Sequence, residues 1–250
     1  MKLKSIVAGV AMLSSTGAFA GVTGNVGAFS EYMFRGIEQS NGVAVQGGLD
    51  LGLDIGAYAG TWVSNTKFPG YSVGNVSYET DLYAGYTKKW GDFGVDVGAV
   101  YYYYRDDTRL NTIEGYIGAL LGPATIKLFY TPEYFGAPDP GSTDPDDRGD
   151  GLYLTASAAF PLNATVTLTP QVGYSKGDGV QSFVLSAFEP GPDGVFGTGD
   201  EDPDDNYFDY SLTLAKTLDA GFTFSFAVIG TNLEKDDEKL VVGLKKTFDI

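Results

Sequence analysis

The sequence predicts an all-β fold, a single antiparallel transmembrane β-barrel of about 12 strands, and three observations support this prediction. Stretches of about ten residues alternate large apolar with small or polar side chains, as at 222–228, and a period of two is typical of a strand. About ten residues is also the length that a tilted strand needs to cross a bilayer. Finally, short turns alternate with long polar loops, as in outer-membrane barrels.

The alternating segments give twelve expected strands in chain order. They lie at about residues 23–34, 43–54, 56–64, 77–89, 92–104, 111–121, 124–134, 151–161, 163–175, 206–218, 221–231 and 239–249. Five connections are short, and we expect these to be periplasmic turns: 54–56, 90–92, 121–123, 161–163 and 218–221. The other six are long and rich in Gly, Pro and Asp, and we expect them to be extracellular loops: 36–42, 66–76, 105–110, 135–150, 176–205 and 232–238.

Aromatic residues collect at the ends of the expected strands, as the interfacial girdles of a membrane barrel require. The outer girdle is predicted to hold Tyr32, Phe34, Tyr101, Tyr103, Tyr130, Tyr174, Phe208 and Tyr210. The inner girdle is predicted to hold Trp90, Phe93, Phe160, Phe222 and Phe248. A soluble β-sandwich with an aromatic core is the alternative, but its strands are usually shorter, about 5 or 6 residues.

Both ends of the chain carry targeting features. Residues 1–20 have the pattern of a cleaved signal peptide, with Lys2 and Lys4, an apolar core at 6–13 and the A-x-A site Ala18-Phe19-Ala20. Residues 21–250 would then form the outer-membrane barrel. The alternating segment 240–250 resembles the C-terminal assembly signal of such barrels, although it ends in Ile rather than Phe. We therefore expect export through the periplasm and contact with the barrel-assembly machinery during biogenesis.

The composition excludes several classes of function. The chain has 16 basic and 32 acidic residues and a net charge of −16, so nucleic acid is not expected as a partner. It contains no His and no Cys. Serine–histidine hydrolases, common zinc hydrolases and thiol enzymes therefore lose a general base, a ligand or a nucleophile. We expect no enzymatic activity and no cofactor.

Strand phase predicts which charged side chains point into the lumen. Leu49, Leu51 and Leu53 take the lipid-facing phase, so alternate residues of that strand face inward. The same reasoning gives eight inward acids and three inward bases: Glu31, Asp50, Asp54, Glu79, Asp81, Asp96, Glu114 and Asp209 against Arg35, Lys127 and Lys245. Such a lining would favour cations or neutral solutes over anions. The alternative is that these charges pair with each other and fill a narrow barrel.

Two acidic loops are weak candidates for Ca²⁺ or Mg²⁺. Asp200, Asp202 and Asp204 have the D-x-D-x-D spacing that can surround one hard cation. The segment lacks the Gly and the Glu that complete an EF-hand loop, and the run at 144–147 is no better. A solvated external loop explains these charges more simply.

The tripeptide Phe34-Arg35-Gly36 has a physical interpretation at the rim of the barrel. Phe34 would join the outer girdle, Arg35 would face Glu31 on the same side of the strand, and Gly36 would allow the bend into the first loop. Arg35 could then hold a solute or close the rim as one half of an ion pair. The phase of Trp62 is ambiguous, so this residue could face either the lumen or the lipid.

Several stretches of the chain resemble the TorF-type family of porins, which are Gram-negative outer-membrane proteins. The similarity lies in the segments 24–27, 30–36, 39–40, 45–50, 58–65, 79–86, 114–116, 130–136, 209–212 and 242–248. The insert 190–205 is longer and more acidic than this family's pattern, and the end at Asp249-Ile250 departs from its terminal Phe. The resemblance implies a channel-like barrel with an unsettled substrate, and it implies no catalytic residue.

Together these observations predict an outer-membrane, porin-like channel for passive diffusion of small hydrophilic solutes. Its other expected partners are outer-membrane lipid and lipopolysaccharide. The competing hypothesis is a closed structural or surface-interaction barrel, whose acidic loops bind a partner or divalent cations. An open barrel would conduct ions in a planar bilayer, whereas a closed barrel would not.

Overall fold

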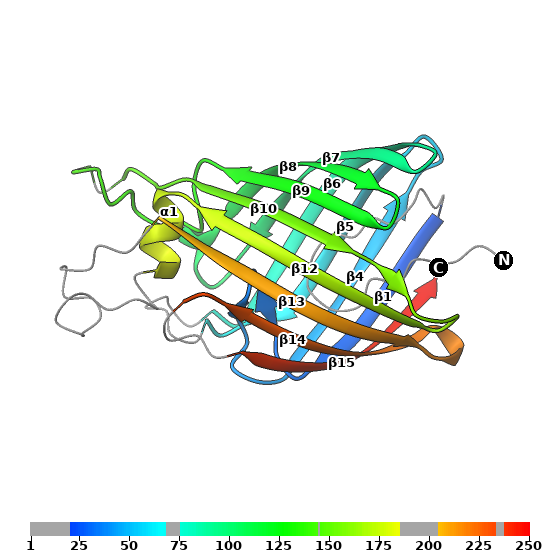
Figure 1. Cartoon of the computed structure of the whole chain (residues 1–250). Helices are drawn as coiled ribbons and strands as arrows, with labels where there is room; N and C mark the ends of the chain where they lie inside the picture. The colour runs from blue at the N-terminus through cyan, green and yellow to red at the C-terminus, as the bar shows by residue number, and fades with distance from the viewer. Residues whose placement is uncertain (1–20, 69–75, 145, 186–204, 234–237) are drawn as a thin grey trace.

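The computed structural model describes residues 21–68, 76–144, 146–185, 205–233 and 238–250 and shows a closed antiparallel β-barrel of twelve strands (Figure 1). This confirms the predicted fold class and strand number. The strands are β1 (Gly21–Phe29), β4 (Ala44–Gly52), β5 (Ala57–Asn65), β6 (Tyr78–Trp90), β7 (Phe93–Tyr103), β8 (Thr112–Leu121), β9 (Ala124–Thr131), β10 (Gly151–Ala158), β12 (Val166–Lys176), β13 (Asn206–Thr217), β14 (Phe222–Thr231) and β15 (Lys239–Asp249).

The chain also forms several smaller elements. The short strand β11 (Phe160–Pro161) continues the line of β10 and also pairs with β12. A separate hairpin is formed by β2 (Met33–Phe34) and β3 (Ile37–Glu38). The helical pieces are η1 (Thr108–Leu110), α1 (Asp178–Val180), η2 (Gln181–Leu185) and η3 (Asp219–Gly221). No helix in the described ranges is long and apolar enough to cross a membrane.

The barrel closes through pairing of its first and last strands. Each long strand pairs with its neighbours in the sequence, and β1 pairs with β15 from Thr23↔Asp249 to Phe29↔Gly243. Closure gives every strand two partners, so the sheet has no edge whose N–H and C=O groups would face lipid unpaired.

The two ends of the barrel differ in the length of their connections. Short turns and the C-terminus lie at one end, and the long connections, together with α1, lie at the other (Figure 1). Gly91 and Gly122 adopt φ values of +65° and +58° in two of the short turns, where a side chain would be strained. In the turn before β12, Asn163 Oδ1 instead accepts backbone hydrogen bonds from Thr165 (2.9 Å) and Val166 (3.0 Å).

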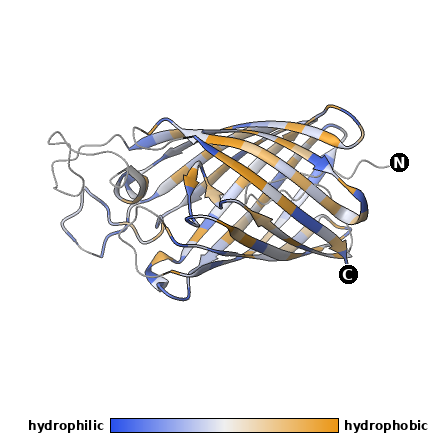
Figure 2. Cartoon of the chain, turned by 90° about the horizontal axis from the view of Figure 1, so that it is seen from below, coloured by the Kyte–Doolittle hydropathy of each residue, from blue (hydrophilic) through white to orange (hydrophobic). Residues whose placement is uncertain are grey.

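Alternation of side chains gives the barrel an apolar outer surface (Figure 2). Leu214, Phe226 and Val242 lie side by side on three neighbouring strands and are all exposed on the outside. Their sequence neighbours Thr213, Ser225 and Val241 are buried and face inward. Aromatic residues of the predicted girdles, such as Tyr130 and Phe208, are among the exposed outer residues.

The first strand ends earlier than the sequence predicts, and this difference reorganises the interior. β1 stops at Phe29 rather than near 34. The Ser30 N–H still donates to the Val242 carbonyl at 2.8 Å, but the Val242 N–H donates to Ser30 Oγ at 3.0 Å instead of to a backbone carbonyl, and the ladder ends there. The chain then turns into the lumen. The prediction that Tyr32 and Phe34 belong to the outer girdle is therefore wrong: Tyr32 is buried and Phe34 packs against the inner core.

We predict that arginine substitution of outward aromatic residues has a cost that depends on depth. Phe226 lies near the middle of β14 and is 40% exposed, so Phe226→Arg should destabilise the barrel by about 2–4 kcal/mol in lipid vesicles. Phe208 lies near the long-loop end of β13 and is 54% exposed, so Phe208→Arg should cost only about 0–1 kcal/mol. Denaturant unfolding followed by tryptophan fluorescence measures both, and equal costs would contradict this placement of the membrane.

Candidate functional site in the barrel interior

The interior is the candidate functional site because its wall carries the chain's buried polar groups. The inward positions of β6, β7, β8 and β13 hold acids and tyrosines where the core of a soluble sandwich would hold aliphatic residues. Buried among them are Glu79, Asp81, Asp96, Glu114, Lys127 and Asp209. Strand alternation alone places these groups, since each is flanked in its strand by outward neighbours.

The hairpin β2–β3 folds from the rim of the barrel into the lumen. A two-residue turn joins its strands, with Arg35 at φ 49° and Gly36 at φ 84°. Positive φ at both central residues is the geometry of a type I′ turn, which matches the twist of a hairpin. The turn therefore projects the Arg35 side chain towards the opposite wall.

Arg35 forms the central ion pair of the lumen with Glu114 on β8. Its Nη2 donates to both carboxylate oxygens, at 2.8 Å and 2.6 Å, and both side chains are almost completely buried. Tyr102 Oη donates a third hydrogen bond to Glu114 at 3.0 Å. The guanidinium carbon also lies 4.3 Å from the ring centre of Tyr153 and 4.7 Å from that of Phe34, so aromatic rings surround the cation.

The expected pairing of Arg35 with Glu31 is wrong. Because the hairpin turns inward, the two residues separate, and Glu31 lies instead near Glu38 and Lys239. Lys239 forms an ion pair with Glu38 at 3.1 Å. Partial burial and the nearby Glu38 carboxylate raise the pKa of Glu31 above its ordinary value, although Lys239 opposes this shift.

A second polar cluster joins the hairpin region to β6. Glu79 accepts hydrogen bonds from Tyr32 Oη (2.8 Å) and Tyr104 Oη (2.5 Å). Asp81 lies next to Glu79 on the same face of the strand and is also buried. Within the described part of the chain, neither acid has a basic side chain within ion-pair distance, and Glu79 is held by tyrosine hydroxyls instead.

The part of the wall formed by β10 and β13 contributes Asp209 and two tyrosines. Tyr153 Oη donates to Asp209 Oδ1 at 3.2 Å, and Tyr207 Oη donates to the backbone carbonyl of Arg35 at 3.1 Å. A β-carbon at Gly36 would lie 2.9 Å from Asp209 Cβ and 2.4 Å from Thr231 Cγ2. The turn of the hairpin thus sits directly against this wall, and only glycine fits there.

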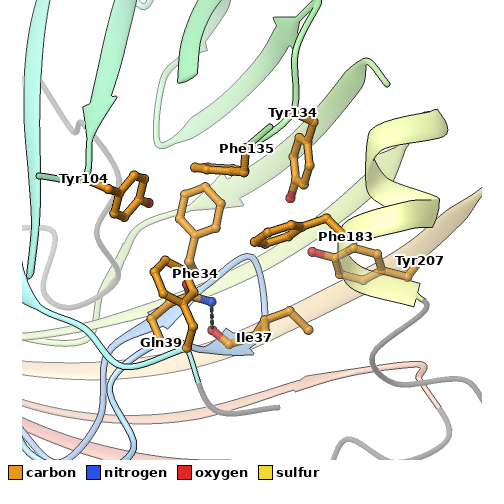
Figure 3. Close-up of a pocket in the computed structure, with 9 residues that line it drawn as sticks. Phe34, Ile37, Gln39, Tyr104, Tyr134, Phe135, Phe183 and Tyr207 are labelled. Carbon is orange, nitrogen blue, oxygen red and sulfur yellow. Dashed lines mark hydrogen bonds between the residues drawn. The ribbon is translucent and has the colours of Figure 1, made fainter. Parts of the chain in front are cut away.

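On the long-loop side of the hairpin, a small aromatic pocket lies between the hairpin, the wall and the helical segment after β12 (Figure 3). Phe34 meets Phe135 edge-on at 5.8 Å between ring centres, and Phe135 stacks on Phe183 at 5.8 Å. Burial raises the pKa of Tyr134 to about 12, so this phenol stays neutral. The aromatic groups pack against each other and cover this side of the hairpin.

Beyond the hairpin, towards the short-turn end, the interior is polar and partly exposed. Lys127 and Asp96 form an ion pair at 2.7 Å between β9 and β7, and Tyr58 Oη donates to Asp96 at 2.7 Å. Asp50 accepts a hydrogen bond from Tyr83 and lies near Lys245. Asp50 and Lys245 are only partly buried, in contrast to the groups around the hairpin.

The charged residues proposed from strand phase thus fall into four places in the structure. Arg35, Glu114, Glu79, Asp81 and Asp209 surround the hairpin. Asp50, Asp96, Lys127 and Lys245 lie in the short-turn half, Glu31 lies at the base of the hairpin, and Asp54 is exposed in the turn after β4. The metal candidates Asp200, Asp202 and Asp204 lie outside the described residues. Within those residues, no group of three or more acidic side chains is arranged to hold a metal ion.

Strand phase did not identify the tyrosines and the tryptophan that complete the site. Tyr102 and Tyr104 carry the inward phase of β7, next to the girdle residues Tyr101 and Tyr103. The available signal was the alternation of this strand, because Tyr102 and Tyr104 alternate with Tyr101 and Tyr103. Trp62, whose phase was ambiguous, faces inward and meets Tyr32 edge-on at 5.2 Å between ring centres. It therefore supports the hairpin and is not part of the lipid-facing surface.

Solved structures with a similar fold include porins. The KdgM porin gives a TM-score of 0.57 at 13% identity and covers 90% of this chain and 99% of that chain. The NanC porin gives 0.55 at 10% identity, covering 92% and 100%. A second KdgM structure, in complex with disordered oligogalacturonate, gives 0.53 at 13% identity, covering 91% and 98%. At these identities the similarity shows the shared fold.

The comparison with curated proteins gave no match. A family model does match the sequence over residues 14–187, and its description is "Bacterial protein of unknown function (Gcw_chp)". The match includes the hairpin, the strands from β1 to β12, and four of the charged residues around the hairpin, namely Arg35, Glu79, Asp81 and Glu114. Since it spans more than half of the chain, the protein belongs to the Gcw_chp family.

Proposed function

We propose that this protein is a porin-like channel of the outer membrane, through which small hydrophilic solutes diffuse passively. The observation that carries the proposal is the partly exposed polar lining in the short-turn half of the closed barrel. Eight inward residues there are only half-buried: Thr23, Asn25, Gln46, Asp50, Thr167, Thr169, Gln171 and Lys245. A barrel of twelve strands lies between those that side chains fill at about 8 strands and the wide pores of about 16 to 18.

The proposed location follows from the outer surface and from the expected signal peptide. The apolar belt would contact lipid, and the long connections would contact lipopolysaccharide outside the cell. Residues 1–20 would direct export, and the barrel-assembly machinery would insert the mature chain with the short turns in the periplasm. The resemblance to TorF-type porins supports the same location. Passive diffusion needs no catalytic residue, so we propose no enzymatic activity.

The charges of the lumen support a preference for cations or neutral solutes. Two acids are neutralised by ion pairs, Glu114 with Arg35 and Asp96 with Lys127. Asp50, Glu79, Asp81 and Asp209 form no ion pair within the described residues, and Lys245 is the nearest base to Asp50. A surplus of negative charge in a low-dielectric channel repels anions and concentrates cations. An acidic oligosaccharide such as oligogalacturonate is therefore not the solute that we propose for this chain.

The competing proposal is a closed structural or surface-interaction barrel. The hairpin favours it, because this segment fills the long-loop half of the lumen with buried side chains such as Tyr32, Met33 and Ile37. On this proposal the short-turn half would be a blind polar cavity. Electrical recording distinguishes the two proposals, since only a continuous aqueous path carries ions.

We predict discrete conductance steps when the purified, refolded protein is added to a planar lipid bilayer. A salt gradient should give a reversal potential of the sign for cation preference. That preference should shrink as salt shortens the Debye length from about 10 Å at 0.1 M to about 3 Å at 1 M. An anion-selective reversal potential would contradict the acidic lumen, and an absence of steps would favour the closed barrel.

Two substitutions in the short-turn half should move the selectivity in opposite directions. Asp50→Asn removes a negative charge and should weaken cation preference, whereas Lys245→Gln removes a positive charge on a nearby strand and should strengthen it. Both residues are partly exposed and lie away from the hairpin contacts, so the conductance steps should persist. Reversal potentials measured at 0.1 M salt test this, and shifts of the same sign would show that these residues do not line the ion path.

A further inference from the structure

We infer that the β2–β3 hairpin is a gate, and that the ion pair between Arg35 and Glu114 is the latch that holds it closed. The inference rests on the proposed channel function and deepens it. In the structure the hairpin occupies the lumen, so ions and solutes would pass freely only when it leaves this position.

Movement of the hairpin would leave the β1–β4 ladder paired, but it would break the hydrogen bonds that the Lys67 and Phe68 N–H groups donate to the Gln39 carbonyl, at 2.6 Å and 3.0 Å. Phe29 and Ala44, the residues on either side of the segment 30–43, are directly paired in the β1–β4 ladder. The segment is therefore an excursion from an intact sheet. It also has its own internal pairing, Met33↔Glu38 and Phe34↔Ile37, with a backbone hydrogen bond from Gln39 N–H to the Tyr32 carbonyl at 2.7 Å. It can therefore move as one unit.

Specific polar contacts hold the hairpin to separate parts of the wall. Arg35 binds Glu114 on β8, Tyr32 binds Glu79 on β6, and Tyr207 on β13 binds the Arg35 carbonyl. Lys239 on β15 adds an ion pair to Glu38. These contacts extend across the lumen, so the hairpin bridges separate strands of the wall instead of covering one part of it.

The free energy of the buried Arg35–Glu114 ion pair is suited to a latch. A buried ion pair gains its attraction at the cost of removing two charges from water, so its net contribution to stability is small. When the hairpin moves out, both charges regain water, so the ion pair itself adds little to the free-energy difference between the closed and open arrangements. Removing one partner has a different effect, because the remaining charge is then buried without compensation. Loss of Glu114 should therefore favour release of the hairpin.

The first test compares two buried ion pairs, one that joins the hairpin to the wall and one that joins two strands of the wall. Glu114→Gln removes the carboxylate that binds the hairpin, and we expect open probability in single-channel records to rise by at least about tenfold, equivalent to about 1.4 kcal/mol. Asp96→Asn removes a comparably buried carboxylate, which binds Lys127 from one barrel strand to another. The partners shown for Asp96, namely Tyr58, Thr87 and Lys127, all lie on barrel strands, so this variant should change open probability less than Glu114→Gln does. Equal open probability in wild type and Glu114→Gln would overturn the inference.

The second test locks the hairpin in place. The natural chain has no Cys, so Glu38→Cys and Lys239→Cys introduce the only thiols, at two partly exposed positions whose charged ends lie 3.1 Å apart. A short bifunctional thiol reagent should join them and abolish the openings, while each single-Cys variant treated with the same reagent should keep them. Undiminished conductance after complete cross-linking, checked by mass spectrometry, would overturn the gate.

A third variant separates failure of the gate from failure of the channel. Because Phe29 and Ala44 are paired neighbours, a short Gly-rich turn can replace residues 30–43. This variant should be open all the time if the hairpin is the gate. If it conducts with the same open probability as the wild type, the gate is wrong and the channel stands. If the variant folds, as judged by its heat-dependent gel mobility, and gives no conductance, both proposals are wrong.

Discussion

The need to pair every backbone N–H and C=O group within lipid determines the architecture of this protein. Only a closed sheet satisfies that need with strands, and closure here depends on the seam between β1 and β15. A closed sheet of twelve strands has an inner surface too large for its own wall side chains to fill. A further segment, the β2–β3 hairpin, fills the long-loop half of this interior, and the proposed channel function requires the short-turn half to hold water.

The two halves of the lumen follow from how the charges are partnered. Around the hairpin, tyrosine hydroxyls satisfy the acids, as Tyr32 and Tyr104 do for Glu79, and aromatic rings surround the Arg35 cation. Such contacts fix these groups in position. In the short-turn half, Asp50 and Lys245 remain partly exposed. On the proposed function, the hairpin half would control passage and the short-turn half would select the solute.

The fold could be predicted from the sequence because alternation, strand length and turn length are local properties. The inward phase of Glu79, Asp81 and Glu114 came from the same pattern. The hairpin could not be predicted in this way. Residues 30–34 continue the alternation of β1. The strand ends where the Ser30 hydroxyl, instead of a backbone carbonyl, accepts the hydrogen bond from the Val242 N–H, and the alternation does not show this. The partner of Arg35 lies 79 residues away in the sequence, so a local pattern indicated Glu31 instead.

The seam also has a consequence for the order of assembly. Closing it brings together residues more than 200 positions apart, such as Ser30 and Val242, and contacts of such long range form late because of their loop-closure entropy. The wall against which Gly36 packs, at Thr231 and Asp209, belongs to the C-terminal strands. The hairpin is made early in synthesis, yet its place in the lumen exists only after the last strands have joined. We therefore expect a newly inserted barrel to pass through a stage in which its lumen is still unobstructed.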